Sequence, residues 1–411
     1  MRDLLPRDTA LWQRIEDEAR RVLRAYNFDE IRTPILEQTA LFARSVGEDT
    51  DIVTKEMYTF VDRSEESLTL RPEATASIVR ACIEHRIFNE GGIHKLYALG
   101  PMFRRDRPQK GRYRQFYQID AEVLGSESPA VDIEMLEMLA LFLRRVSILQ
   151  FTLLINSVGC GTCRVEYLKA LREALASVKD QMCSDCRRRA ETNPLRVLDC
   201  KVPADQPIIE RLPRMIDYLC PGCERHFDEV LAGLDLRSIA YQVTPRLVRG
   251  LDYYTRTTFE ITSSALGAQD SLLGGGRYDG LSEALGGPPA PGIGFAIGED
   301  RLVLAVEAVA GLKPERALAA YVVWLGEEAR KAASTLAREL RDRGLSAEMG
   351  YEPAKLKKSL GVASKLGARF AVIIGEGELQ AGVYQVKDLD SGQQEGMDPG
   401  RVGDYLVGRL G

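Results

Sequence analysis

Positively charged side chains are concentrated in residues 103–118 (FRRDRPQKGRYRQFYQ), which hold five arginines and one lysine. The planar guanidinium group of arginine matches phosphate oxygens, because it can donate two parallel hydrogen bonds. The segment therefore favours a site for a polyphosphate or a nucleic acid. A solvated basic loop is the alternative that the residue types leave open.

The residues after this loop alternate between polar and apolar. Successive side chains of a strand point to opposite faces, so Gln118, Asp120 and Glu122 share one face. Ile119 and Ala121 share the other face. A polar face of this kind lies against water or against a binding site, and the neighbouring arginines favour the binding site.

Two further regions combine arginine with glycine. Arg249 lies in residues 247–254 (LVRGLDYY), and an arginine in an apolar run needs an anionic partner, either a structural carboxylate or a phosphate. Residues 274–281 (GGGRYDGL) contain three consecutive glycines, which permit close approach to a ligand or a tight turn. Residues 292–302 (GIGFAIGEDRL) predict a strand leading into a helix, with Arg301 in the first turn, where anions are attracted.

Seven of the eight cysteines lie between residues 156 and 238. Six of them form three C-x-x-C pairs: Cys160 and Cys163, Cys183 and Cys186, Cys220 and Cys223. Cys200 lies between the second and third pairs, and His226 lies just past the third. The first two pairs are separated as in a zinc ribbon, which predicts a structural zinc site. Unused thiols in a reducing cytosol are the alternative.

The pattern of apolar residues predicts the elements that position these side chains. Apolar residues recur at helical spacing from Asp8 to Tyr26, which predicts an opening helix with Asp8 as its N-cap. Residues 28–36 predict a strand that Pro34 interrupts, so the strand belongs at an edge or a bulge.

Further along the chain, the basic loop at 106–111 predicts a hairpin between two strands. The elements expected in this part are strands at 95–105 and 112–124, a helix at 129–146, an inserted cysteine-rich module at 156–238, strands between 241 and 298, and a helix at 299–309. Residues 311–316 predict a linker. Beyond it, strands at 319–325, 345–349, 370–374 and 384–388 alternate with helices at 327–343 and 355–366, as in a small α/β domain.

Composition excludes several classes of protein. The chain has 411 residues, of which 45% are apolar and 28% charged, as in a globular protein of two or three domains. No run of eighteen apolar residues and no apolar signal core occur, so we expect a cytoplasmic protein without a membrane span. The net charge of −5 disfavours a protein that coats DNA.

Together these segments resemble the histidyl-tRNA synthetases, a family of class II aminoacyl-tRNA synthetases. Residues 32–34 (RTP) resemble class II motif 1, residues 103–104 with the basic loop and Arg112 resemble motif 2, and residues 292–301 resemble motif 3. Residues 247–254 and 274–281 resemble the two signatures that distinguish the histidine family. Residues 46–58 (VGEDTDIVTKEMY) and 70–76 (LRPEATA) are similar to that family as well.

The resemblance implies a fold of mixed α+β and α/β class in several domains. Residues 1–155 and 239–312 are expected to form a class II catalytic domain, an antiparallel sheet flanked by helices. Residues 156–238 would be an inserted module that contacts the acceptor arm of tRNA, or else a solvated helical surface. Residues 313–411 would be an α/β anticodon-binding domain, in which Lys355, Lys357 and Lys358 lie near the expected contact surface.

The resemblance also implies roles for individual residues. Arg104 and Arg249 would act at the α-phosphate of ATP, while Arg112 and Arg301 would contact the outer phosphates. The expected histidine-binding residues are Glu73, Ala74, Thr75, Arg104, Gln118, Glu122, Arg249, Tyr253, Tyr254 and Tyr278. Among these, Glu73 and Thr75 would bind the α-amino group of histidine, and Gln118 would lie near its carboxylate. Glu122, Tyr253 and Tyr254 would line the imidazole pocket, which Tyr278 would support. A buried ion pair between Glu122 and an arginine is the alternative for that residue.

The implied activity is a histidine–tRNA ligase that uses ATP with Mg²⁺, forms histidyl-adenylate and transfers histidine to tRNA(His). A homodimer is implied, and catalysis in this family does not use zinc. The alternative function is a non-catalytic, histidine-binding paralogue that regulates ATP phosphoribosyltransferase. That paralogue typically lacks the C-terminal domain and has degraded signatures, whereas Arg104, Arg249 and Arg301 are all present here.

Overall fold

The computed structural model describes residues 2–47, 50–107, 109–266, 271–310 and 318–410. The chain divides into two compact units, Met1–Lys313 and Pro314–Gly411. The predicted linker at 311–316 lies outside the described residues. None of the described helices combines the length and the apolar character that crossing a membrane requires.

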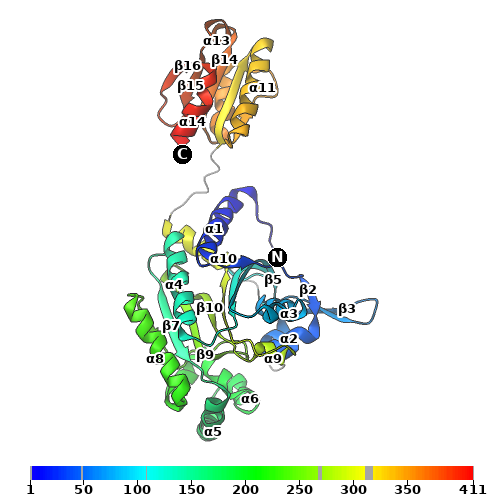
Figure 1. Cartoon of the computed structure of the whole chain (residues 1–411), viewed down its shortest axis with the longest axis vertical. Helices are drawn as coiled ribbons and strands as arrows, with labels where there is room; N and C mark the ends of the chain where they lie inside the picture. Colours follow the sequence, from blue (N-terminus) through cyan, green and yellow to red (C-terminus); the bar gives the residue numbers. More distant parts are fainter. Residues whose placement is uncertain (1, 48–49, 108, 267–270, 311–317, 411) are drawn as a thin grey trace. The chain divides into compact units, whose positions relative to one another are not determined.

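The first unit is built on a large, mainly antiparallel sheet (Figure 1). Its strands, in spatial order, are β1 (Asp29–Glu30), β5 (His94–Phe103), β6 (Gln115–Leu124), β11 (Gly292–Gly298), β10 (Ser271–Arg277), β9 (Thr255–Thr262), β7 (Thr152–Ser157) and β8 (Tyr241–Val243). Within this sheet, the outer pairs β1 with β5 and β7 with β8 are parallel, and the other pairs of described strands are antiparallel. The predicted hairpin of β5 and β6 is confirmed, and it pairs His94 with Leu124 at one end and Phe103 with Gln115 at the other.

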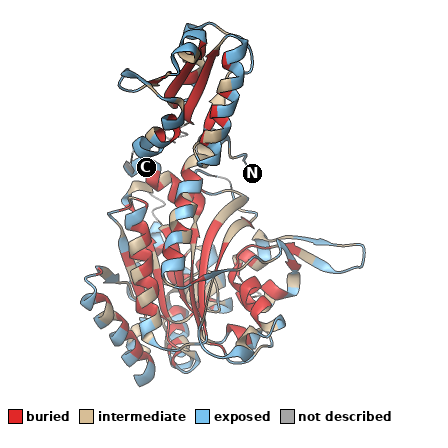
Figure 2. Ribbon diagram, turned by 45° about the horizontal axis from the view of Figure 1, so that its top comes forward, coloured by how far each residue is buried: buried red, intermediate tan, exposed pale blue. Residues whose placement is uncertain are grey.

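Helices cover one face of this sheet and contribute to its main core. They are α1 (Pro6–Ala25), α4 (Pro129–Arg145), α8 (Pro221–Leu236) and α10 (Glu299–Ala310). Their buried apolar residues join those of the strands in one cluster, which includes Ile119 and Ala121. Figure 2 shows that the buried residues follow the strands and the inward sides of these helices. The apolar side of β6 therefore faces the helices, which leaves Gln118, Asp120 and Glu122 on the opposite side.

The opposite face holds a smaller layer. It contains α2 (Thr39–Val46), α3 (Thr75–Glu84), α9 (Leu281–Ala284) and a three-stranded sheet in the order β2 (Leu36–Gln38), β4 (Ser67–Leu70), β3 (Tyr58–Val61). Arg71 fixes this layer to the large sheet, because its guanidinium donates to the carbonyl of Thr33 at 3.0 Å and to that of Pro101 at 3.1 Å. Arg71 therefore has a structural role, because it holds the segment that resembles motif 1 against β5.

Two predictions for the start of the chain are wrong. Helix α1 begins at Pro6, and Asp8 is in its first turn, where the carboxylate accepts a hydrogen bond from the backbone of Leu5 at 3.4 Å. Proline suits the first helical position, because its missing N–H would have no partner there. The predicted strand at 28–36 is reduced to the two residues of β1, with Leu36 starting β2. Pro34 cannot donate to a strand ladder, which accounts for the interruption.

The cysteine-rich insertion consists mainly of helices. They are α5 (Gly161–Val178), α6 (Ser184–Thr192), α7 (Gln206–Ile209) and α8, with short single turns between them. The insertion has a core of its own, to which seven cysteines contribute, four of them buried and three partly buried, alongside Tyr167 and Leu171. His226 on α8 meets Asp132 on α4 at 2.9 Å, and the buried Arg277 on β10 pairs with the same carboxylate at 2.9 Å. This buried group joins the insertion to the large sheet and to α4.

The second unit is a five-stranded mixed sheet in the order β13 (Ala347–Met349), β12 (Leu318–Leu325), β14 (Ala368–Gly375), β15 (Tyr384–Asp388), β16 (Gln394–Met397). Its helices are α11 (Glu327–Asp342), α12 (Leu356–Lys365), α13 (Glu376–Ala381) and α14 (Val402–Leu410). The predicted α/β domain is confirmed. The strand β16 and the helices α13 and α14 were not predicted, because each is short and shows too few repeats of a helical or strand period.

Candidate active site

Two cavities adjoin on the open face of the large sheet. The larger has a volume of about 400 Å³ and the smaller about 160 Å³. They share one set of lining residues, which are Arg104, Gln118, Arg249, Gly250, Gly274 and Ala296. The arginines at 104 and 249 therefore stand where the contents of the two cavities would meet.

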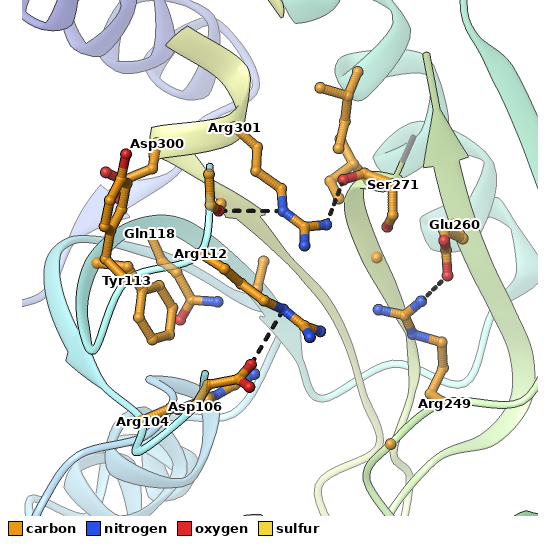
Figure 3. Close-up of a pocket in the computed structure, with 18 of the residues that line it drawn as sticks. Arg104, Asp106, Arg112, Tyr113, Gln118, Arg249, Glu260, Ser271, Asp300 and Arg301 are labelled. Carbon is orange, nitrogen blue, oxygen red and sulfur yellow. Dashed lines mark hydrogen bonds and ion pairs between the residues drawn. The ribbon is translucent and has the colours of Figure 1, made fainter. Parts of the chain in front are cut away.

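Arginines surround the larger cavity (Figure 3). Arg301 donates to the carbonyls of Ser271 at 3.0 Å and Gly111 at 3.4 Å, which connects α10 to the basic loop. Arg112 pairs with Asp106 at 3.2 Å and is half exposed. Arg104 donates to the carbonyl of Pro72 at 2.9 Å, with its guanidinium stacked on Phe116. The arrangement offers several cationic groups around one volume, as a polyphosphate requires.

Arg249 forms an ion pair with Glu260 on β9 (Figure 3). Of the two partners that the sequence allowed for Arg249, the structural carboxylate is therefore present. Arg249 also lines both cavities, so a phosphate bound there would be within its surroundings as well. Close approach of this side chain depends on Gly274, since a Cβ there would stand 2.0 Å from Arg249 Nη2. The first glycine of the GGG segment therefore makes room for a charged side chain and does not form a tight turn.

Glu122 is fully buried beside the smaller cavity. Its carboxylate accepts hydrogen bonds from Thr75 Oγ1 at 2.6 Å and from the Tyr278 hydroxyl. Burial raises the pKa of Glu122 to about 8, against the effect of these two hydrogen bonds. No arginine pairs with this carboxylate among the described residues, so the ion-pair alternative does not hold. Thr75 and Tyr278 both line the cavity, so they connect the buried carboxylate of Glu122 to its wall.

Glu73 holds the start of α3. Its carboxylate accepts from the backbone N–H of Thr75 and of Ala76, both at 2.9 Å. Burial raises the pKa of Glu73 above its usual range, although these hydrogen bonds oppose the shift. Ala74 is fully buried, directly precedes the helix and lines neither of the two cavities.

Two tyrosines close the smaller cavity. Tyr253 packs against Tyr254 with ring centroids 4.8 Å apart and against Tyr278 at 5.6 Å. Burial raises the pKa of Tyr254 to about 12, so this hydroxyl remains protonated. The rings give the cavity an aromatic wall, which suits a flat heterocycle.

Asp120 was not assigned a role from the sequence, although its place on the polar face was predicted. It is almost fully buried and lines the smaller cavity. Neither of its carboxylate oxygens has a hydrogen-bond partner in the described structure. Burial, together with the charges of Glu122 and Glu73, raises the pKa of Asp120 well above its usual range. An unpartnered carboxylate in a cavity provides a place for a cationic group. The alternation of polar residues along β6 placed Asp120 on the polar face, but it gave no reason to prefer Asp120 over its neighbours as a binding residue.

The cysteines do not group as their spacing suggested. The first pair lies with the third, so Cys160 and Cys163 meet Cys220 and Cys223. Cys183 and Cys186 lie instead with Cys200 and Asp205. His226 contacts Asp132 and belongs to neither group. The zinc-ribbon pairing is therefore wrong, because α5 and the turns after it return the chain to its starting point before the third pair.

Comparison with known proteins identifies the family. Residues 1–183 and 221–302 match the family model described as histidyl-tRNA synthetase. The chain belongs to the histidyl-tRNA synthetase family. Residues 319–409 match the model of an anticodon-binding domain. The match to the histidyl-tRNA synthetase model omits residues 184–220, which hold most of the second cysteine group.

Relatives in this family match over nearly the whole chain. The histidine–tRNA ligase of Koribacter versatilis is 58% identical, covering 98% of this chain and 94% of its own length. That of Solibacter usitatus is 57% identical over 96% of this chain and 94% of its own length. The structure of histidyl-tRNA synthetase from S. aureus superposes with a TM-score of 0.82 at 38% identity, over 99% of this chain and 98% of that one. The class II fold with a C-terminal anticodon-binding domain is thereby confirmed.

Proposed function

We propose that this chain is a histidine–tRNA ligase. A carboxylate oxygen of histidine attacks the α-phosphorus of ATP, pyrophosphate leaves, and histidyl-adenylate forms. The terminal ribose hydroxyl of tRNA(His) then attacks the histidyl carbonyl, and AMP leaves. This is the activity named for the relatives that match 96–98% of the chain at 57–58% identity.

The observation that carries the proposal is the shared wall of the two cavities. A carboxylate is already nucleophilic at neutral pH, so adenylation requires positioning and neutralised charge and needs no general base. Arg104 and Arg249 line both cavities, and so stand where a carboxylate in one would meet an α-phosphate in the other. Their positive charge would stabilise the phosphorus centre as negative charge develops on it.

The smaller cavity suits histidine. We place the imidazole against Tyr253 and Tyr254, with its nitrogens bonded to the hydroxyls that Glu122 orients. Imidazole needs a partner at each nitrogen, and a side chain lacking these would leave buried polar groups unpaired. We place the α-ammonium group at Asp120 and not at Glu73, because the Glu73 carboxylate already accepts two backbone hydrogen bonds whereas that of Asp120 has no partner in the described structure. Gln118 would lie beside the reacting carboxylate. Gln118 Oε1 has no protein partner in the described structure, which is consistent with a ligand contact.

The larger cavity suits ATP with its Mg²⁺. Arg112 and Arg301 are placed to contact the outer phosphates. Glu56 also lines this cavity, and carboxylate oxygens are ligands that Mg²⁺ accepts. When bound, Mg²⁺ would neutralise phosphate charge.

Three assignments follow from the proposed activity. The second unit would bind the anticodon of tRNA(His), as the match of residues 319–409 supports. A homodimer is supported by exposed apolar residues around the motif 1 segment, since Ile35, Leu36 and Phe60 are each more than 40% exposed. The cytoplasm is the proposed location, because charged tRNA is consumed there by translation.

Amino-acid-dependent exchange of pyrophosphate into ATP tests the proposal. We expect exchange with histidine and not with the other nineteen amino acids, followed by charging of tRNA(His). Absence of exchange with any amino acid, in protein shown to be folded, would instead favour the regulatory paralogue. Exchange with a different amino acid would contradict the assignment of the smaller cavity.

A further inference from the structure

Four cysteines from two distant parts of the chain meet at one point in the insertion. Cys160 precedes α5 and Cys220 precedes α8, and each is followed three residues later by a second cysteine, Cys163 or Cys223. Cys160 Sγ lies 3.6 Å from Cys163 Sγ and 4.0 Å from Cys220 Sγ. All four sulfurs lie within 4.8 Å of one another.

These separations fit a shared metal ion. A tetrahedral zinc site with Zn–S bonds of about 2.3 Å places its sulfurs about 3.8 Å apart, whereas a disulfide holds them at about 2.05 Å. The backbone N–H of Cys220 also points to Cys163 Sγ at 3.1 Å. Such N–H groups stabilise thiolates in the outer shell of metal sites. The group therefore has four soft ligands and an oriented backbone donor.

A second group with the same character lies nearby in the insertion. Cys183, Cys186, Cys200 and Asp205 have their ligand atoms within 4.8 Å of one another. Cys183 Sγ lies 3.9 Å from Cys200 Sγ, and Cys200 Sγ lies 3.4 Å from Asp205 Oδ2. Asp205 is 1% exposed, although a carboxylate is rarely buried without a cationic partner. The backbone N–H groups of Cys186 and Val202 each point to a cysteine sulfur at 3.4 Å.

The segment around these groups has little regular structure that could stabilise it without a metal. Residues 179–220 contain α6 and α7 but otherwise consist of single turns and irregular segments. The core of the insertion is small, and cysteine side chains make up much of it. Segments of this size without an extended core usually depend on a metal or a disulfide. Seven of the eight cysteines of the chain belong to the two groups, while Cys82 lies apart on α3.

The second group also adjoins the catalytic cleft. Arg196, between Cys186 and Cys200, donates to the backbone carbonyl of Arg249 at 3.2 Å. Asp199 and Lys201 flank Cys200 and line the larger cavity. A metal at this group would fix the segment that forms one wall of that cavity.

We propose that the insertion binds two structural Zn²⁺ ions. One is held by Cys160, Cys163, Cys220 and Cys223. The other is held by Cys183, Cys186, Cys200 and Asp205, and it positions the segment at 196–201 against the catalytic cleft. Each site has a full set of four protein ligands, as structural zinc sites do, and zinc takes no part in the reaction. The proposal concerns the insertion and does not depend on which amino acid the smaller cavity binds.

Metal analysis of the full-length protein tests the two sites directly. Protein produced with zinc in the medium and purified under reducing conditions is expected to hold about two zinc ions per chain. Cys160→Ser with Cys163→Ser, and separately Cys183→Ser with Cys200→Ser, should each reduce the content to about one. Cys82→Ser is the matched control, because it removes a buried cysteine outside both groups and should leave two.

A second measurement covers variants that fail to fold. Wild-type protein stripped of metal under reducing conditions is titrated with Co²⁺, whose visible absorption reports tetrahedral thiolate ligation. Two equivalents should bind, and zinc should displace both. The second site should be distinguishable by its weaker sulfur-to-cobalt absorption, because it has three thiolates in place of four.

Several results would overturn the proposal. A zinc content under about 0.2 per chain, with no tetrahedral Co²⁺ spectrum, would remove both sites. If the wild-type protein held one zinc ion per chain, and only the Cys160→Ser with Cys163→Ser variant lost it, the second site would be excluded. Disulfides within the groups, detected by intact-mass measurement, would contradict metal binding. Iron detected by metal analysis would contradict the assignment of zinc. None of these results would alter pyrophosphate exchange with histidine as a test of the proposed activity.

Discussion

Gly294 on β11 is paired with Glu122 on β6, and a Cβ atom at residue 294 would stand 1.6 Å from Glu122 Oε2. The glycine therefore makes room for the carboxylate that orients Thr75 and Tyr278. A side chain at this position must displace Glu122, because strand pairing fixes the backbone on both sides.

Gly294→Ala should weaken histidine binding. Loss of a hydrogen bond to a charged group costs about 1.5–3 kcal/mol, so the KM for histidine in pyrophosphate exchange should rise by roughly tenfold to a hundredfold. The KM for ATP should change little. Gly280→Ala is the control, since a Cβ there has open space around it. Normal histidine affinity in Gly294→Ala would show that the position of Glu122 does not matter.

Arg249→Ala should act on the rate more than on affinity. Removal of one charge donor from a transition state costs about 3–4 kcal/mol, so adenylate formation should slow by at least about a hundredfold in single-turnover assays. Histidine affinity should fall by a smaller factor. A rate close to that of the wild type would exclude Arg249 from a catalytic role.

The ion pair with Glu260 requires its own control. Arg249→Ala leaves Glu260 without its partner, and this unpaired carboxylate could disturb the cavity by itself. The double variant Arg249→Ala with Glu260→Gln removes that charge, and the loss of rate should persist in it. Recovery of the rate in the double variant would trace the defect to Glu260.

The sequence predicted the elements that depend on local pattern. Alternation along β6 correctly placed Gln118, Asp120 and Glu122 on one face, because the two-residue period of a strand is a local property. Arg301 was correctly placed in the first turn of α10 for the same reason. Relations between distant strands were not predictable in this way. That Gly294 faces Glu122 follows from the register of β11 against β6, which only the assembled sheet determines.

The cysteines show the same limit. Spacing along the chain suggested that the first and second pairs belong together, but α5 carries the chain away from Cys163 and α8 begins beside it. Asp205 was not predicted as a member of any group, since single aspartates are common in solvated segments. Its burial and its contact with Cys200 come from the tertiary fold alone.

Asp120→Asn should weaken binding of the α-ammonium group of histidine. The neutral amide keeps the shape of the carboxyl group but cannot ionise to pair with a cation, so the KM for histidine should rise at least about tenfold. Imidazole-propionate, which lacks the amino group, gives a matched comparison as a competitive inhibitor. Wild-type protein should prefer histidine strongly over this analogue, and the variant should lose most of that preference. An unchanged preference would place the ammonium group elsewhere, with Glu73 as the next carboxylate to test.

Glu299 at the start of α10 should make stability depend on pH. It is 1% exposed, and burial, with a smaller contribution from the charge of Glu16, raises its pKa to about 9. In the unfolded chain the pKa is about 4.3, so the folded state binds the proton more tightly. Its contribution to stability is therefore fully present below about pH 4 and declines as the pH rises, until the folded carboxyl ionises near pH 9.

Glu299→Gln removes this titration and should unfold with less pH dependence than the wild type. Between about pH 5 and pH 8, the free energy of unfolding of the variant relative to the wild type should rise by up to about 4 kcal/mol. Denaturant unfolding at the two pH values measures this difference, and any cost of burying the amide cancels because it is present at both. Glu307→Gln, at an exposed position of the same helix, should show no such change. A difference that is equal at both pH values would mean that Glu299 is ionised in the folded protein throughout this range.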